Sequence, residues 1–237
     1  MILANVRSRL RAADLRLVVR ALSGQDAGRR ARYEQVLAEE GPDRLLDDPA
    51  LLTALLAVRS LAVPSATLFT YVAVRHTLLA GGTDDPALAD YLAALLLEFG
   101  DHDRHTRVRD RDDESYRYLV DIVADLGEHD TGGERGFLLQ AHLGNYSLWL
   151  AGLFPDYIAA RRTRSGGPDL PYYDELGRHG YALASRHRLA ERFGVAGIFR
   201  AAADRFPALR AAFNRLSDRI LFPFPNVLTP ERLLRSL

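Results

Sequence analysis

Eighteen uncharged residues follow one another over Phe137–Phe154, in the order FLLQAHLGNYSLWLAGLF. A stretch of this length reaches the lower limit for a helix that spans a membrane. Four polar residues lie inside it: Gln140, His142, Asn145 and Ser147. Each of them would cost free energy in hydrocarbon, so we predict a central helix buried in a protein core and no transmembrane segment.

Helical periodicity extends from this segment over nearly the whole chain. Near the C-terminal end, Phe206, Leu209 and Phe213 repeat at helical spacing. Alternation with a period of two and Asn-Gly hairpins are both missing, so we expect no sheet. We predict an all-α fold, an irregular multi-helix bundle of about nine to eleven helices with orthogonal packing.

Gly, Pro and Asp residues mark where the helices begin and end. The expected helices cover residues 1–22, 26–40, 49–58, 66–80, 87–99, 114–126, 137–154, 155–164, 172–193, 195–205 and 206–221. We expect two parts. Residues 1–41 form a basic N-terminal helical pair that either projects as an arm or packs on the body. Residues 42–237 form the main helical domain, with an extended Pro-rich tail from about residue 222.

The composition excludes several kinds of chemistry. The chain of 237 residues contains no cysteine, which excludes disulfides, thiolate metal sites and cysteine nucleophiles. All 31 basic residues are arginine, so a Schiff-base lysine and a P-loop lysine are excluded as well. Abundant Arg, Ala, Leu and Gly are typical of a high-GC bacterial genome. We expect a soluble protein of the reducing cytoplasm.

The net charge of zero conceals basic ends around an acidic middle. Residues 1–32 hold eight arginines and two acids, residues 84–114 hold ten acids and four arginines, and residues 178–237 hold eleven arginines and four acids. Five arginines flank the apolar stripe of the first helix: Arg7, Arg9, Arg11, Arg16 and Arg20. Such a helix can bind a protein partner, a second copy of the chain or an anionic membrane surface, or it can pack on its own body.

The leading functional hypothesis is a non-enzymatic helical module for protein interaction or self-association. Three other hypotheses stay open, and each starts from a local residue pattern. One is a small-molecule pocket around the central helix, with these residues: Gln140, His142, Asn145, Ser147, Trp149, Tyr173 and His179. The alternative for those polar residues is that other helices satisfy them in the core.

The second pattern is Glu98, His102 and His105, spaced i, i+4 and i+7 on one face of a continuous helix. One carboxylate and two imidazoles meet the ligand needs of zinc or non-haem iron, which would make the protein a metal-dependent enzyme. The alternative is a solvated acidic loop after Gly100. We expect no other cofactor, and no Ser-His-Asp arrangement or Gly-rich phosphate loop is present, so the sequence leans away from an enzyme.

The stretch LAVPSATLFTYV over residues 61–72, followed by RHTLL over residues 75–79, resembles the turn and recognition helix of TetR-type repressors. In that family a Val-Ser turn leads into a Thr-Leu-Tyr-x-Tyr-Phe helix and then into a Lys-Glu-x-Leu-Leu helix. Ala62 stands here for the turn glycine, and Pro64 for the capping serine. The resemblance implies a ligand-responsive transcription regulator that would bind DNA through residues 47–79.

Overall fold

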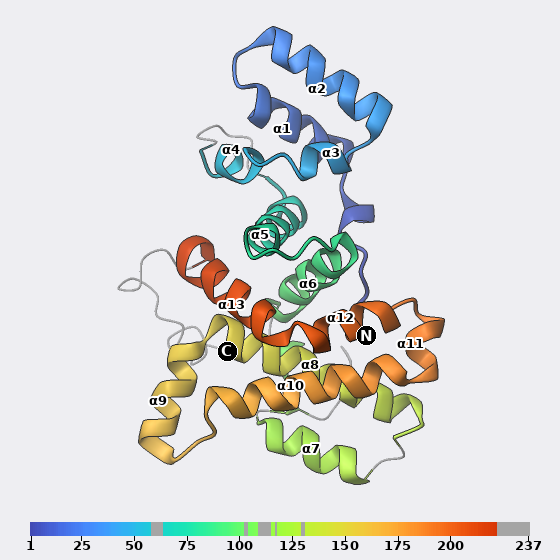
Figure 1. The fold of residues 1–237 in the computed structure, drawn as a ribbon, viewed down its shortest axis with the longest axis vertical. Helices are drawn as coiled ribbons and strands as arrows, with labels where there is room; N and C mark the ends of the chain where they lie inside the picture. Colours follow the sequence, from blue (N-terminus) through green and yellow to red (C-terminus); the bar gives the residue numbers. More distant parts are fainter. Residues whose placement is uncertain (58–63, 102–103, 109–114, 117, 129–130, 222–237) are drawn as a thin grey trace. The chain divides into compact units, whose positions relative to one another are not determined.

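A computed structural model describes residues 1–57, 64–101, 104–108, 115–116, 118–128 and 131–221. Over these residues the chain is 78% helical and has no strand. Thirteen α-helices are present in the described part, and eleven of them have seven or more residues. The predicted all-α, multi-helix fold is confirmed (Figure 1). The extended Pro-rich tail expected from about residue 222 lies outside the described residues.

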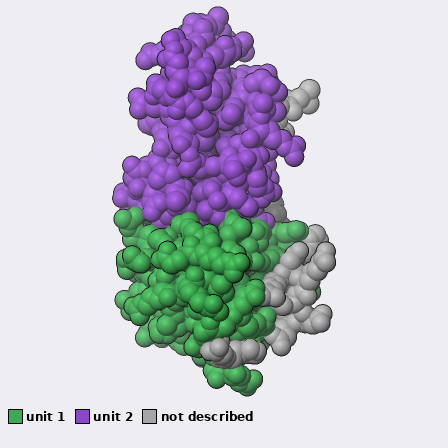
Figure 2. Space-filling view, turned by 90° about the vertical axis from the view of Figure 1, so that its right-hand side faces the viewer, with its two compact units in different colours: residues 1–3, 98–237 green, residues 4–97 purple. Residues whose placement is uncertain are grey.

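The chain divides into two compact units, which Figure 2 colours separately. The N-terminal unit comprises Ala4–Leu97, and the C-terminal unit comprises Glu98–Leu237 together with Met1–Leu3. This boundary differs from the one drawn at residues 41 and 42 from the sequence. Within the N-terminal unit, the first two helices contact the two short helices that follow Gly41, and the apolar stripe of the first helix is buried.

The N-terminal unit is built from six helices and one short turn. They are η1 (Arg7–Arg9, a 3-10 turn), α1 (Ala12–Ser23), α2 (Ala27–Glu40), α3 (Asp43–Leu46), α4 (Leu51–Ala57), α5 (Ala66–Ala80) and all but the end of α6 (Pro86–Phe99).

The single helix expected over residues 1–22 is interrupted. Leu10 has an extended backbone conformation, and α1 starts only after Arg11. Asp14 accepts a hydrogen bond from the Arg11 backbone N–H at 2.9 Å, which fixes the start of α1.

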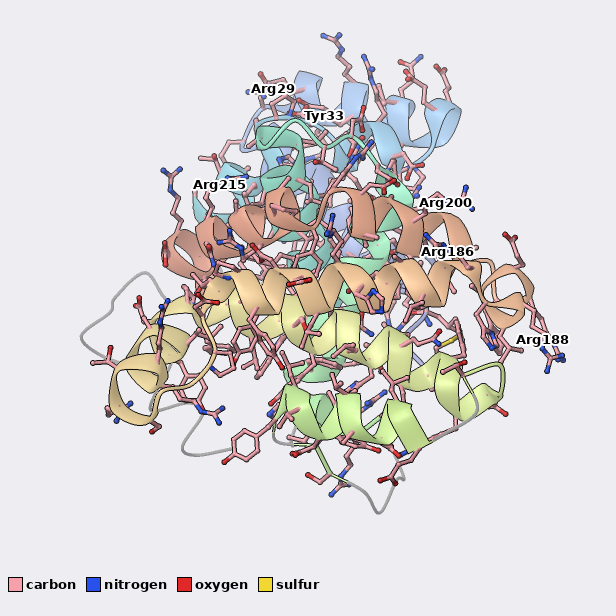
Figure 3. The ribbon with its side chains drawn as sticks, turned by 60° about the horizontal axis from the view of Figure 1, so that its bottom comes forward. Arg29, Tyr33, Arg186, Arg188, Arg200 and Arg215 are labelled. Carbon is pink, nitrogen blue, oxygen red and sulfur yellow. The ribbon has the colours of Figure 1, made fainter. Side chains whose placement is uncertain are left out.

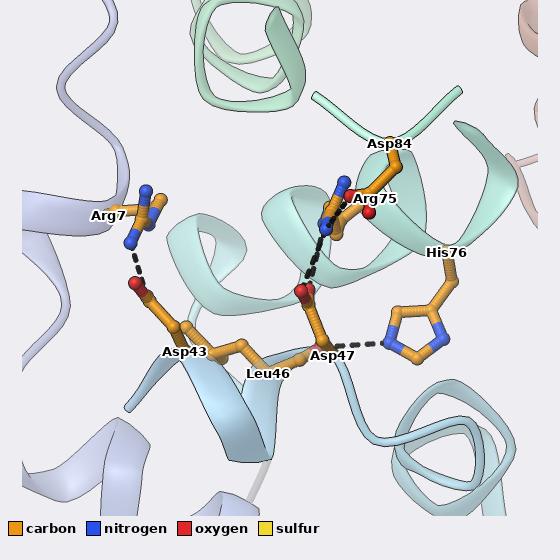
Figure 4. A network of polar contacts seen from close by, with 7 residues as sticks. All are labelled: Arg7, Asp43, Leu46, Asp47, Arg75, His76 and Asp84. Atoms are coloured by element: carbon orange, nitrogen blue, oxygen red, sulfur yellow. Dashed lines mark hydrogen bonds and ion pairs between the residues drawn. The ribbon is translucent and has the colours of Figure 1, made fainter. Parts of the chain in front are cut away.

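A buried arginine joins the loops of the N-terminal unit (Figure 4). Arg75, on α5, is 2% exposed and donates to both carboxylate oxygens of Asp47, at 2.8 and 2.7 Å. Its Nη2 also donates to Asp84 at 2.6 Å. Asp47 follows α3 and Asp84 precedes α6, so one guanidinium ties two loops to α5. The hydrogen bond from Arg75 lowers the pKa of Asp47.

Replacing Arg75 by Met should lower the free energy of unfolding of the N-terminal unit by about 2–4 kcal/mol, since two carboxylates lose their buried partner. Urea denaturation followed by far-ultraviolet circular dichroism measures this change. Arg44→Met is the control, because Arg44 pairs with Glu40 at the surface and is 74% exposed. It should shift stability by less than about 0.5 kcal/mol. Equal effects of the two substitutions would contradict the role of Arg75.

The C-terminal unit surrounds one central helix. Its elements are η2 (Arg104–Thr106), α7 (Leu119–Glu128), α8 (Glu134–Leu153), α9 (Pro155–Ser165), α10 (Leu170–Arg186), α11 (Arg188–Arg192), α12 (Ala196–Asp204), α13 (Phe206–Leu216) and a π-helical turn η3 (Ser217–Leu221). Helices α7, α9, α10 and α13 all contact α8. Residues 136–153 of α8 are buried without exception, as expected for a central core helix.

Glycines set the distance between α8 and α10. A Cβ atom on Gly180 of α10 would lie 2.7 Å from the backbone oxygen of Gln140 and 2.8 Å from the backbone nitrogen of Gly144. A Cβ on Gly144 would lie 2.6 Å from the ring of Tyr181. The backbones of α8 and α10 are therefore in close contact at Gly144 and Gly180, which have no side chains. The small residues of the uncharged stretch admit another helix of the same chain.

The one helix expected over residues 172–193 is two helices. Helix α10 ends at Arg186, and His187 takes an extended conformation between α10 and α11. The imidazole Nδ1 of His187 accepts from the Leu189 backbone N–H at 3.1 Å and so caps α11. Similarly, the helix expected over residues 206–221 ends at Leu216 and continues as a π-helical turn.

In the part of the chain that the structure describes, no helix combines the length and the apolar character needed to cross a bilayer.

Gly180→Ala should destabilise the C-terminal unit by at least about 2 kcal/mol, because the new methyl group meets backbone atoms that cannot give way. Gly127→Ala on α7 is the matched control, since a Cβ there meets nothing within 4 Å. That substitution should stabilise the unit by about 0.5–1 kcal/mol. Urea denaturation followed by the fluorescence of Trp149, the single tryptophan, reports on this unit. If both substitutions changed the free energy of unfolding in the same direction, the close contact between Gly180 of α10 and the backbone of α8 would be refuted.

Candidate functional site

The strongest candidate site is a groove in the N-terminal unit, with a volume of about 720 Å³. Its lining residues are Arg9, Arg11, Ala13, Asp14, Arg16, Leu17, Arg20, Ser65 and Thr67. We call it the arginine groove. It brings together four of the five arginines that the sequence pointed to. The fifth, Arg7, pairs with Asp43 instead, and its backbone N–H donates to Asp90 at 2.7 Å.

The amphipathic pattern of α1 places these arginines in the groove. Leu17, Val18 and Leu22 are buried in the unit, so the opposite face of the helix points to solvent. Arg16 and Arg20 are one helical turn apart on that exposed face.

The start of α5 forms the other wall of the groove. Ser65 caps this helix, since its hydroxyl accepts from the Leu68 backbone N–H at 3.0 Å. Thr67 follows in the first helical turn, where the backbone N–H groups carry a positive partial charge. The sequence pointed to these two residues only as part of the stretch that resembles a TetR-type repressor, and not as neighbours of the arginines of the first helix. Their place in the groove depends on how α5 packs in the unit.

The positive charge of the arginine groove is not neutralised within the described part of the chain. Arg9, Arg11, Arg16 and Arg20 are exposed, and none of them forms an ion pair with a described residue. Asp14 is the one acid in the lining, and its carboxylate already accepts from the Arg11 backbone. Four guanidinium groups around one cavity repel one another, and an anionic ligand would relieve that repulsion. The groove is therefore suited to binding carboxylates or phosphates.

The seven residues of the expected pocket around the central helix differ in burial. Six of them are buried: Gln140, His142, Asn145, Ser147 and Trp149 on α8, and Tyr173 on α10. His179 is exposed on α10 and lines a cavity of about 630 Å³ at the surface of the C-terminal unit. Asn145 accepts a hydrogen bond from the Tyr181 hydroxyl at 2.8 Å. A residue of α10 therefore satisfies one of the buried polar side chains of α8.

His142 lies among aromatic rings in the core of the C-terminal unit. The ring centroids of Phe99, Tyr146 and Tyr116 are 5.7, 5.9 and 6.3 Å from its own. Its Nε2 is buried and has no hydrogen-bond partner among the described residues. Burial, followed by the positive charge of Arg104, lowers the pKa of His142 to about 3. The imidazole is neutral at physiological pH.

The residues proposed as metal ligands have other partners. Glu98 pairs with Arg104 at 3.4 Å. His105 is buried and stacks on Trp149, with 4.4 Å between ring centroids. His102 lies outside the described residues. Among the residues that are described, no group of three His, Cys, Asp or Glu side chains could hold a metal ion.

The stretch that resembles a TetR-type repressor forms a single helix after its turn. Helix α5 runs without a break through residues 72–75, where the family would pass from one helix to the next. Residues 71–75 are all buried, so this part of α5 packs in the unit. The preceding turn, residues 58–63, lies outside the described residues.

The burial of His142 predicts a pH dependence for the C-terminal unit. Its folded-state pKa lies below the ordinary value of 6.5, so the unfolded chain binds the proton more tightly. The free energy of unfolding should therefore fall as the pH drops from about 6.5 towards 3, by up to about 1.4 kcal/mol per pH unit from this group. Urea denaturation between pH 7 and pH 5, followed by Trp149 fluorescence, measures the slope.

His142→Phe should reduce that slope, and His179→Gln at the surface should leave it unchanged. An unaltered slope in His142→Phe would show that other groups cause the pH dependence.

Comparison of the chain with protein-family models, with curated proteins and with solved structures finds no match.

Proposed function

We propose that this protein is a non-enzymatic helical interaction module whose N-terminal unit binds an acidic segment of a partner protein in the arginine groove. The observation that carries the proposal is the set of four exposed arginines around one cavity, none of them paired with an acid of the described chain. Arginine forms bidentate hydrogen bonds with carboxylates, which adds geometric selectivity to the charge attraction.

The charge balance of the N-terminal unit favours a short acidic segment over nucleic acid. Residues 4–97 contain eleven arginines and eleven acidic residues, so the unit has no net positive charge. Proteins that bind duplex DNA contact many phosphates over an extended basic surface. The positive charge here is local, in a concave groove that also contains Ala13 and Leu17. A peptide segment can place carboxylates on the arginines and a small side chain beside Ala13, which is exposed.

The burial of the apolar face of α1 argues against a membrane surface as the ligand. A helix that lies on a bilayer inserts its apolar face between the lipids. In α1 that face includes Leu17, Val18, Val19 and Leu22, which are already buried in the unit. Only the polar face is left for a ligand, which supports a charged and water-exposed partner.

The proposal can be tested with a fluorescein-labelled peptide of ten alternating Glu and Asp residues. Fluorescence anisotropy at low salt measures its affinity for the full chain. The triple variant Arg11→Gln, Arg16→Gln and Arg20→Gln should bind at least about tenfold more weakly, because three charge contacts are lost. The affinity of the unaltered chain should also fall as salt is added.

The matched control is the triple variant Arg29→Gln, Arg30→Gln and Arg32→Gln. These arginines are exposed on α2, form no ion pair with a described residue and lie outside the groove; Figure 3 labels Arg29 among them. The control should change the affinity by less than about threefold. Equal losses of affinity in both triple variants would mean that peptide binding depends only on the overall charge of the protein and not on the arginine groove. If the chain bound a DNA duplex or anionic vesicles more tightly than the acidic peptide, the proposal of a protein partner would be contradicted, and that nucleic acid or membrane would be the ligand.

A further inference from the structure

Four exposed arginines lie where the chain passes from α10 through α11 into α12. They are Arg186, the last residue of α10, Arg188 and Arg192 on α11, and Arg200 on α12. None of the four forms an ion pair with a described residue. Over residues 186–203 these four arginines stand against one acid, Glu191. The excess of positive charge favours an anionic ligand at this part of the C-terminal unit.

The fold gathers these arginines around α11. Both α11 and α12 contact α10, so the end of α10 and the start of α12 lie next to the short helix between them. Arg188 and Arg192 are one turn apart on α11 and share a side of that helix. Figure 3 shows Arg186, Arg188 and Arg200 towards the end of α10 that leads into α11.

An exposed aromatic ring directly follows these arginines in α11. Phe193 is 43% exposed, and it is the one exposed large apolar side chain between residues 186 and 203. Its ring stacks on Phe137 of α8, with 6.2 Å between the centroids and 16° between the planes. The buried Phe137 therefore holds the ring of Phe193 in place while part of that ring faces solvent. A Cβ on Gly194 or on Gly197 would meet nothing within 4 Å, so the space around Phe193 is open.

We propose that these five side chains, which we call the α11 patch, bind single-stranded nucleic acid. The α11 patch consists of Arg186, Arg188, Arg192, Phe193 and Arg200. Guanidinium groups form bidentate hydrogen bonds with phosphate oxygens, and they supply the charge that the backbone of the strand needs. An unpaired base stacks on the open part of the Phe193 ring. None of these residues belongs to the arginine groove, so the inference goes beyond the function proposed above.

The exposed ring distinguishes a single strand from other anionic ligands. The bases of a duplex are paired and stacked on one another, so a duplex can use the arginines but not Phe193. A membrane surface binds by burying apolar side chains in lipid, and the α11 patch offers one such side chain, which Phe137 already holds. An acidic peptide brings carboxylates for the arginines but no base for the ring.

The experiment measures the binding of a fluorescein-labelled oligothymidylate to the full chain by fluorescence anisotropy at low salt. The triple variant Arg186→Gln, Arg188→Gln and Arg192→Gln should raise the dissociation constant at least about tenfold, because three phosphate contacts are lost. Phe193→Ser should raise it at least about fivefold, because stacking of a base on the ring is lost. Phe193→Trp keeps an aromatic ring and should bind at least as tightly as the unaltered chain. A duplex of the same length should bind more weakly than the single strand.

Two triple variants serve as controls. Arg205→Gln, Arg215→Gln and Arg219→Gln remove three arginines of the same unit that lie outside the α11 patch and form no ion pair with a described residue. Arg11→Gln, Arg16→Gln and Arg20→Gln remove three arginines of the arginine groove. Each control should change the affinity for the oligothymidylate by less than about threefold. Circular dichroism checks that every variant is folded.

Several results would overturn the inference. One is that the unaltered chain does not bind the oligothymidylate at low salt. Another is that a control triple weakens binding as much as the triple variant of the α11 patch. A third is that Phe193→Ser binds as tightly as the unaltered chain, or that the duplex or anionic vesicles bind more tightly than the single strand. Failure of the acidic peptide to bind the arginine groove would count against the proposed function alone, because the two sites share no residue.

Discussion

The burial of the uncharged helix α8 is the constraint on which the C-terminal unit depends. A helix that is apolar on all sides must be covered on all sides, and α7, α9, α10 and α13 provide that cover. Helix α10 comes close enough that a Cβ on Gly180 would clash with the backbone of α8 at Gly144. Because α10 is held at this short distance, its opposite side becomes an exposed surface next to α12.

The N-terminal unit is organised by charge as well as by apolar packing. Arg75 is buried and shares its guanidinium between Asp47 and Asp84, so two loops are fixed against α5. Arg7 is tied to Asp43 in the same unit. The arginines of the groove have no such acid within the described chain. The unit therefore contains arginines that hold the fold together and arginines that face solvent around one cavity, besides other arginines exposed elsewhere on its surface.

Most of the helices could be predicted from local signals, since Asp, Ser, Pro and Gly mark helix ends by short-range chemistry. Helix α5 begins after Ser65 and ends before Gly81 as expected, because a cap and a stop act on neighbouring residues. The break at His187 could not be predicted, since the apolar pattern continues through it. His187 also contacts the backbone oxygen of Gly132, 55 residues away, and only the folded chain brings the two together.

The sequence by itself determined the all-α class, the core position of the stretch from Phe137 to Phe154 and the arginine-rich face of the first helix. These features depend on residue type and spacing, which are properties of the chain alone. Only the tertiary structure decided which arginines line a cavity and which form ion pairs with acidic residues. Arg7 and Arg9 are two residues apart, yet Arg7 pairs with Asp43 and Arg9 lines the groove. The difference arises because long-range packing, rather than local spacing, decides which acid each guanidinium can reach.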